Sequence, residues 1–189
     1  MIINKKITLI FLFCTAVGIC SGAFFEVFMN GEGKQQLINM MTGFFSGEGE
    51  LNFSSSFLKC MKTWFILLAP LFLSPLFPPL AVMAPLLPTV KGFTMGFSSA
   101  MLVEAFGIKG GWYIISTMFP QSVIQIPVLC ILAALSAEGS YISLKYFTGR
   151  RRRVYNKNAL QDFARQYLLT YAAGVILIII SCAMESFLN

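Results

Sequence analysis

The sequence contains no histidine, and only eight of its 189 residues are acidic. The lack of histidine excludes a His general base, the HExxH zinc site and the Ser-His dyad of intramembrane proteases. No CxxC pair occurs either, so the usual ligand spacings for zinc are missing. We therefore predict a chain that is not an enzyme, with no catalytic residue, no cofactor and no metal site.

The five cysteines are isolated residues. They are Cys14, Cys20, Cys60, Cys130 and Cys182, and most fall in apolar runs, where a buried free thiol behaves as a small hydrophobe. Cys60 falls in an expected outside loop and can form an intramolecular bridge only if Cys20 or Cys182 reaches the surface. We expect no structural disulfide.

Charge of either sign is scarce, at 12% of residues, whereas 57% are hydrophobic. This balance excludes a soluble globular domain. A helix needs about 20 apolar residues to cross a bilayer core about 30 Å thick, and five runs approach that length. They lie at about 7–28, 64–88, 92–108, 112–135 and 167–188. We predict an all-α, polytopic membrane protein with about five transmembrane helices in a single domain, residues 1–189.

The first apolar run allows two interpretations. Two lysines precede an apolar core, and residues 21–23 (SGA) resemble a small-x-small cleavage site, which is typical of a signal peptide. The run nevertheless continues to Phe28 and is long enough to span the bilayer. We favour an uncleaved anchor.

Basic residues predict the orientation, because lysine and arginine in short loops are retained on the cytoplasmic side. With five spans and the N-terminus inside, ten of the fourteen basic residues lie inside, and residues 29–63 form an extracytoplasmic loop. A basic cytoplasmic loop at 137–165 carries a run of four arginines: Arg150, Arg151, Arg152 and Arg153. We predict an inside N-terminus and an outside C-terminus. The arginines suit anionic headgroups of the lipid bilayer, and no aromatic platform accompanies them that would indicate a nucleic-acid partner.

The extracytoplasmic loop is too apolar for a bare linker. Residues 37–45 place Leu, Ile, Met and Phe at helical spacing, and GEGE at 47–50 ends the pattern. Serines at 54–56 can cap a second short helix that leads into the second span. Two compatible interpretations are a pair of interfacial helices on the outer leaflet and a docking surface for an extracytoplasmic partner.

The expected second span contains six prolines: Pro70, Pro75, Pro78, Pro79, Pro85 and Pro88. An interior proline removes one backbone hydrogen bond, and in hydrocarbon the freed carbonyl must find another donor. The segment is either kinked and packed inside the bundle or broken into two half-helices that enter and return. We favour a crossing, because a return would place the arginines outside. Lys91 then falls in the inside connection between the second and third spans.

Two expected spans carry small residues at every fourth position, followed by a glutamate. The patterns are Cys14, Gly18, Gly22 and Glu26 in the first span, and Gly92, Gly96, Ala100 and Glu104 in the third. Such stripes lie on one helix face and let another backbone approach closely. Glu185, near the end of the fifth span, is a third carboxylate at the same boundary.

The three glutamates have two main interpretations. Ordinary carboxylates at the membrane interface would reach into water, whereas a shared acidic cluster at the outer mouth of the bundle would bind a partner or a cation. Paired carboxylates also serve glycoside hydrolysis. We disfavour that activity because no cleft is evident around a shallow site.

The fourth span places polar residues and prolines near the middle of the bilayer. Gln121 and Gln125 lie four apart on one face, and Pro120 and Pro127 lie two turns apart. Polar side chains at this depth face the bundle interior or a water-filled cavity. Interhelical hydrogen bonds, worth about 0.6 kcal/mol each, are one explanation, and a transport pathway is the other. We favour hydrogen bonding, because no ionisable residue is expected at the same depth.

Residues 91–133 resemble the core of the stage II sporulation protein M family. The similar features are Lys91-Gly92 with Gly96, a glycine-containing turn at 107–111, and Pro120-Gln121-Ser122 followed by Pro127. The layout is similar over nearly the whole chain, from the basic N-terminus to a last span that ends in glutamate. Two departures are Ser122, where the family more often has Asn, and the six prolines of the second span.

The resemblance implies a multi-pass protein of the cytoplasmic membrane in the sporulating mother cell, acting in engulfment of the forespore. It would be a scaffold of the peptidoglycan remodelling complex that anchors two extracytoplasmic cell-wall hydrolases, sporulation proteins D and P. The alternative, from a different functional class, is a small channel or transporter subunit, alone or as a homo-oligomer. That alternative would use the proline-rich second span and the glutamines of the fourth.

Overall fold

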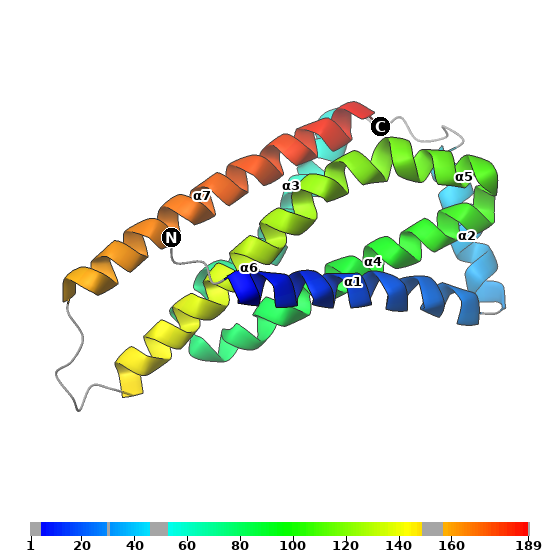
Figure 1. The fold of residues 1–189 in the computed structure, drawn as a ribbon. Coiled ribbons are helices and arrows are strands. Elements are labelled where there is room, and N and C mark those ends of the chain that lie inside the picture. The colour runs from blue at the N-terminus through cyan, green and yellow to red at the C-terminus, as the bar shows by residue number, and fades with distance from the viewer. Residues whose placement is uncertain (1–4, 30, 46–52, 149–156, 189) are drawn as a thin grey trace.

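The protein is almost entirely helical in its computed structural model, which describes residues 5–29, 31–45, 53–148 and 157–188. Within these ranges there is no strand, and the all-α prediction is confirmed. The elements are α1 (Lys5–Phe28), α2 (Glu32–Phe45), α3 (Phe53–Leu73), η1 (Pro78–Val82), α4 (Met83–Phe106), α5 (Ile108–Tyr113), the π-helix η2 (Ile114–Met118), α6 (Phe119–Thr148) and α7 (Lys157–Leu188). Figure 1 shows α2 beside the end of the bundle at which α1 and α4 finish, which we call the α2 end.

Four of the described helices are long and apolar enough to cross a membrane. These segments are Lys5–Phe28, Pro79–Phe106, Phe119–Lys145 and Ala164–Met184. The prediction of an all-α polytopic membrane protein is confirmed. α3 has 21 residues but is not among the four, and its first half includes the charged Lys59 and Lys62.

Hydrogen bonds to the α3 backbone, together with one disulfide, show that α3 nevertheless runs through the bundle. The Tyr171 hydroxyl of α7 donates to the Leu68 carbonyl at 2.6 Å, and the Ser136 hydroxyl of α6 donates to the Leu71 carbonyl at 2.6 Å. The bond between Cys60 and Cys182 joins the opposite ends of α3 and α7. α3 is therefore antiparallel to α7 and parallel to α6, and the five long helices alternate in direction along the chain (Figure 1).

The expected second span at 64–88 is not one helix. α3 ends at Leu73, the chain turns through residues 74–77 and η1, and α4 begins at Met83. The break follows from the prolines, because Pro75 and Pro79 cannot donate backbone hydrogen bonds that would continue α3. The third span is consequently longer than the expected 92–108, and Lys91 lies inside α4 and not in a connection.

Neighbouring hydroxyl groups satisfy the carbonyls that the break leaves free. Pro75 cannot donate to the Leu71 carbonyl, which accepts hydrogen bonds from Ser136 at 2.6 Å and from the Tyr167 hydroxyl at 3.1 Å. The Ser140 hydroxyl donates to the Ser74 carbonyl at 2.9 Å. Backbone polar groups at membrane depth need such partners, so α6 and α7 stabilise the end of α3.

The prediction of no structural disulfide is wrong. Cys60 and Cys182 are bonded, with their Cα atoms 6.0 Å apart. The error has a physical origin, since α3 extends back to Phe53 and carries Cys60 into the bundle. Cys182, near the end of α7, is fully buried beside it, whereas Cys20 is an exposed free thiol.

Two expected loops are largely helical. Residues 29–63 contain α2 and the first half of α3, and the basic loop at 137–165 is shortened because α6 reaches Thr148 and α7 begins at Lys157. The fourth span, expected at 112–135, begins with α5 and η2 and continues 13 residues further as α6. The arginine run at 150–153 lies outside the described residues.

Candidate functional site

The contact between α1 and α4 is built on four glycines, Gly18, Gly22, Gly92 and Gly96, which we call the glycine seam. All four are buried. A Cβ atom added to Gly22 would clash with the Phe93 carbonyl oxygen, and one added to Gly96 would clash with that of Ile19. The two helix backbones therefore touch, which is how small residues associate helices in lipid.

The register of the glycine seam brings two glutamates to one place. Gly92 lies against Thr15, and Gly96 lies against Ile19, so α1 and α4 run in parallel. Glu26 follows Gly22 by four residues, and Glu104 follows Gly96 by eight, with Ala100 at the position between them. A single register thus places both carboxylates at the α2 end.

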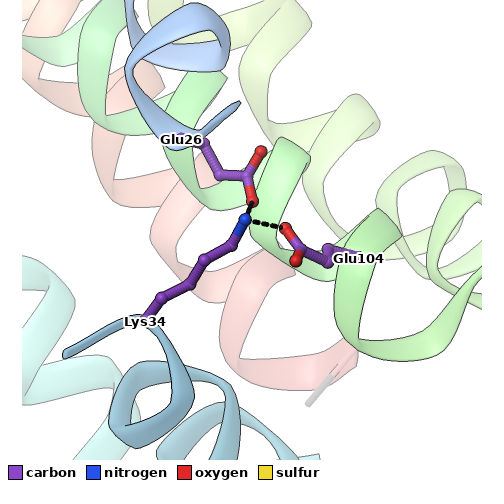
Figure 2. Close-up of polar contacts among 3 residues, drawn as sticks. All are labelled: Glu26, Lys34 and Glu104. Atoms are coloured by element: carbon purple, nitrogen blue, oxygen red, sulfur yellow. Dashed lines mark ion pairs between the residues drawn. The ribbon is translucent and has the colours of Figure 1, made fainter. Parts of the chain in front are cut away.

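Lys34 of α2 bridges these two carboxylates, as Figure 2 shows. Its Nζ lies 3.1 Å from Oε1 of Glu26 and 2.6 Å from Oε2 of Glu104. The turn from α1 to α2 passes through Gly31, whose φ of 104° is a left-handed conformation that favours glycine. Three elements therefore meet in one ion-pair group, which we call the Lys34 cluster.

The members of the Lys34 cluster differ in burial. The exposed fraction is 6% for the Glu26 side chain, 17% for Lys34 and 41% for Glu104. Because Glu26 is withdrawn from water, its ionised form depends on the nearby ammonium. Hydrogen bonds to Glu104 and then to Glu26 raise the pKa of Lys34 above its ordinary 10.5, so Lys34 stays a cation.

This geometry is suited to holding α2 against the bundle. With both carboxylates ionised, the cluster carries one net negative charge, and its exposed member, Glu104, faces solvent. Among the described residues, no group of three or more His, Cys, Asp and Glu side chains is placed to hold a metal ion. The expected third carboxylate, Glu185, has a side chain outside the described part of the structure.

The glutamines of the fourth span lie on α6, and one of them bonds to α7. Gln125 is buried and its Nε2 donates to the Ser181 hydroxyl of α7 at 3.1 Å. Gln121, one turn away, is half-buried. The Ser122 hydroxyl donates to the Met118 carbonyl, within the π-helical turn that precedes Pro120. π-Helical turns are common where the regular backbone ladder is interrupted.

Lys91 lies inside α4, at a different depth from the glutamines of the fourth span. It precedes Gly92, which contacts Thr15, and the Thr15 hydroxyl lies 3.4 Å from the Cys130 sulfur of α6. Because α4 and α6 are antiparallel, Lys91 and Gln125 lie on opposite sides of this level and about 9 Å apart along the bundle, counted at 1.5 Å per residue. The Lys91 ammonium lies over the buried Trp64 ring of α3, 5.0 Å from the centroid, a contact that strengthens when desolvated.

Two of the residues that complete these contacts have only weak signals in the sequence. Lys34 is the sole basic residue between Glu26 and Lys59, and such isolation within a loop next to a membrane carboxylate marks a candidate partner. Ser181 has no comparable signal, because serine in an apolar helix is equally suited to bonding its own backbone. Both assignments depend on which helices are neighbours.

Helices of this length and composition, joined by glycines and by buried polar contacts, define a multi-pass all-α membrane protein. A family model described as stage II sporulation protein M matches residues 7–188. The chain belongs to that family and is a sporulation membrane protein, which confirms the resemblance found in residues 91–133. Comparison with curated proteins and with solved structures found no match.

Proposed function

We propose that this protein is a non-enzymatic scaffold of the engulfment machinery in the mother cell membrane. It anchors extracytoplasmic peptidoglycan hydrolases, sporulation proteins D and P, through the α2 end of the bundle. Membership of the stage II sporulation protein M family supports a role in sporulation. The lack of histidine in the whole sequence supports a role in binding over one in chemistry.

The proposal places the N-terminus inside and the α2 end and C-terminus outside. Alternation of the five long helices puts the beginning of α1 and the end of α7 at opposite ends of the bundle (Figure 1). The Cys60–Cys182 bond lies toward the α2 end, and disulfides form and persist in oxidising, extracytoplasmic surroundings. The basic residues at the opposite end support the same orientation.

The attachment of α2 by the Lys34 cluster is the observation that carries the proposal. A short helix between two membrane segments would be free to lie on the lipid surface, but Lys34 holds this one against α1 and α4. Its opposite face is solvent-exposed, with Gln35, Gln36, Asn39 and Met40. A fixed helix loses little conformational freedom on binding, and that favours affinity for a partner.

Co-purification from membranes tests the proposal. Wild-type protein is expected to retain both hydrolases, whereas a variant with Gln36→Ala, Asn39→Ala and Met40→Ala is expected to lose them. Lys109→Gln on α5 is the matched control, since it changes an exposed residue of the same end without touching α2. Unchanged recovery of both hydrolases by the α2 variant would refute docking on this helix.

The channel or transporter alternative has weaker support. The amide nitrogen of Gln125 donates a hydrogen bond to the Ser181 hydroxyl within the α6–α7 contact, and such a bond stabilises helix packing. Lys91 of α4 lies about 9 Å from the level of Gln125 along the bundle, and its ammonium lies over the Trp64 ring. If Gln121→Leu alters solute flux in vesicles while the α2 variant keeps both hydrolases, the alternative replaces the scaffold.

A further inference from the structure

The first half of α3, which lies toward the α2 end, carries two lysines. Lys59 and Lys62 flank Cys60, whose bonded partner Cys182 follows Ser181, the residue hydrogen-bonded to Gln125. Lys59 and Lys62 lie six and nine residues from the beginning of α3 at Phe53. Their Cα atoms are therefore about 9 and 14 Å along α3, at 1.5 Å per residue, from the end of the helix that lies toward the α2 end.

Both lysine side chains are exposed, and no ion-pair partner for either lies among the described residues. They lie three residues apart and so share one helix face. In the described part of the chain neither ammonium makes an ion pair, and the ion pairs found there involve Lys34. A cation at such a depth is costly unless an anion or water reaches it.

The direction of α3 lets both ammonium groups reach the membrane interface. Side chains on a helix tilt toward its N-terminus, and α3 begins toward the α2 end (Figure 1). A lysine stem spans several ångströms of apolar surface while its ammonium stays at headgroup level. Both charges therefore reach the layer in which lipid phosphates lie.

The surface around the lysines is apolar on the membrane side. Leu58, Phe65 and Ile66 are exposed at 66%, 76% and 63%, and exposed apolar residues continue along α3 to Phe72 and Leu73. The patch thus combines two cations about one helical turn apart with exposed apolar side chains beside them and further along α3. This combination matches one molecule with an anionic head and acyl chains better than it matches a water-soluble anion or an acidic peptide.

We infer that Lys59, Lys62 and the exposed apolar strip of α3 form a binding site for an anionic phospholipid. The phosphate lies between the two ammonium groups, and the acyl chains cover Phe65 and Ile66. This lipid covers the exposed face of α3, the long helix that is not among the four apolar enough to cross a membrane. The inference is independent of the hydrolase-docking role of α2.

Native mass spectrometry of the detergent-purified full chain tests this site. Phosphatidylglycerol is expected to stay bound in preference to phosphatidylcholine, and Lys59→Gln with Lys62→Gln is expected to weaken its binding roughly 30-fold, the effect of two basic contacts. Lys59→Arg with Lys62→Arg keeps the charges and is expected to bind normally. Lys109→Gln, an exposed lysine on α5, is the matched control.

Folding of the glutamine variant is checked by its Cys60–Cys182 bond on a non-reducing gel, because Cys60 lies between the two substituted residues. Phosphatidylglycerol binding equal to that of the wild type in a folded variant would overturn the inference. Equal retention of phosphatidylcholine and phosphatidylglycerol by the wild type would overturn it as well. If the glutamine variant keeps its lipid and loses a co-purifying acidic protein, the surface is a protein interface.

Discussion

The ammonium of Lys34 lies 2.6 Å from a carboxylate oxygen of Glu104, 70 residues further along the chain. The same ammonium pairs with the more buried Glu26. One lysine thereby connects the extracytoplasmic helix of the proposed topology to the two helices of the glycine seam (Figure 2). The position of α2 is consequently coupled to the packing of α1 on α4, because Lys34 contacts a residue of each.

Replacement of Lys34 by methionine is expected to release α2. The change removes the cation and leaves Glu26 buried without a counter-ion, which is unfavourable. Pulsed electron paramagnetic resonance with nitroxides at Asn39 on α2 and Ile108 on α5 should show a broader distance distribution. Lys109→Met, which removes an exposed lysine from α5, should leave the distribution narrow, and an equally narrow one in Lys34→Met would contradict the prediction.

The contribution of Lys34 to α2 docking is expected to be insensitive to pH across the neutral range. The pKa of Lys34 is raised above 10.5 on docking, so its contribution is fully present below that value and is lost as pH rises through the raised pKa. The same distance measurement should stay constant from pH 7 to about pH 10. A loss of α2 docking in the wild type near pH 8 would refute this assignment.

An alanine at Gly96 is expected to separate α1 from α4. Its Cβ would clash with the Ile19 carbonyl, a backbone atom that cannot rotate away. Overpacking of this kind costs about 1–3 kcal/mol, which should appear as a lower free energy of unfolding in detergent titration. Gly111→Ala serves as the control, because nothing lies within 4 Å of its added Cβ, and equal stability of the two variants would count against the seam.

Replacement of Cys60 or Cys182 by serine is expected to lower the free energy of unfolding by about 2–4 kcal/mol, because the disulfide between them closes a long loop. The two residues are 122 positions apart. Wild-type protein should migrate faster on a non-reducing gel than after reduction, and both serine variants should lose that difference. Cys20→Ser removes an exposed free thiol and should retain it. A wild-type chain with five alkylatable thiols before reduction would exclude the bond.

Replacement of Tyr167 by phenylalanine is expected to destabilise the junction between α3 and η1 by about 1 kcal/mol. The Tyr167 hydroxyl donates to the carbonyls of Leu71 and Phe72 at 3.1 and 3.3 Å. Ser136 donates to the same Leu71 oxygen, so adding Ser136→Ala should cost more than the sum of the single changes. Tyr141 is exposed, and Tyr141→Phe should leave the unfolding free energy unchanged. Simple additivity would indicate that the two hydroxyl groups act independently.

The membrane class could be predicted because it depends on composition and on run length alone. The same holds for the small-residue stripes, since glycine at every fourth position defines a helix face whatever its neighbour is. Span boundaries around the prolines could not be predicted equally well. A proline removes a donor at a known place, but whether the helix kinks or ends depends on the partners for the freed carbonyl, here Ser136 and Tyr167.

The Cys60–Cys182 bond shows the same dependence on neighbours. Both cysteines are evident in the sequence, yet their pairing requires α3 to begin at Phe53 and to lie beside α7. The expected second span, 64–88, lay too far along the chain at both ends. Its late start put Cys60 in a loop, and its late end put Lys91 in a connection. One misplaced span thus produced several wrong expectations, because a shift along a helix changes both the depth and the face of every residue on it.

By itself the sequence determined that this is an all-α membrane protein, that α1 and α4 carry glycine faces ending in glutamates, and which family motif it bears. These properties are local, since they depend on hydropathy and on spacing within one helix. Only the tertiary structure decided that the two glycine faces meet, that Lys34 joins Glu26 to Glu104, and that α3 returns through the bundle. Those contacts link residues far apart in the chain, and their pairing depends on the packing of all the helices together.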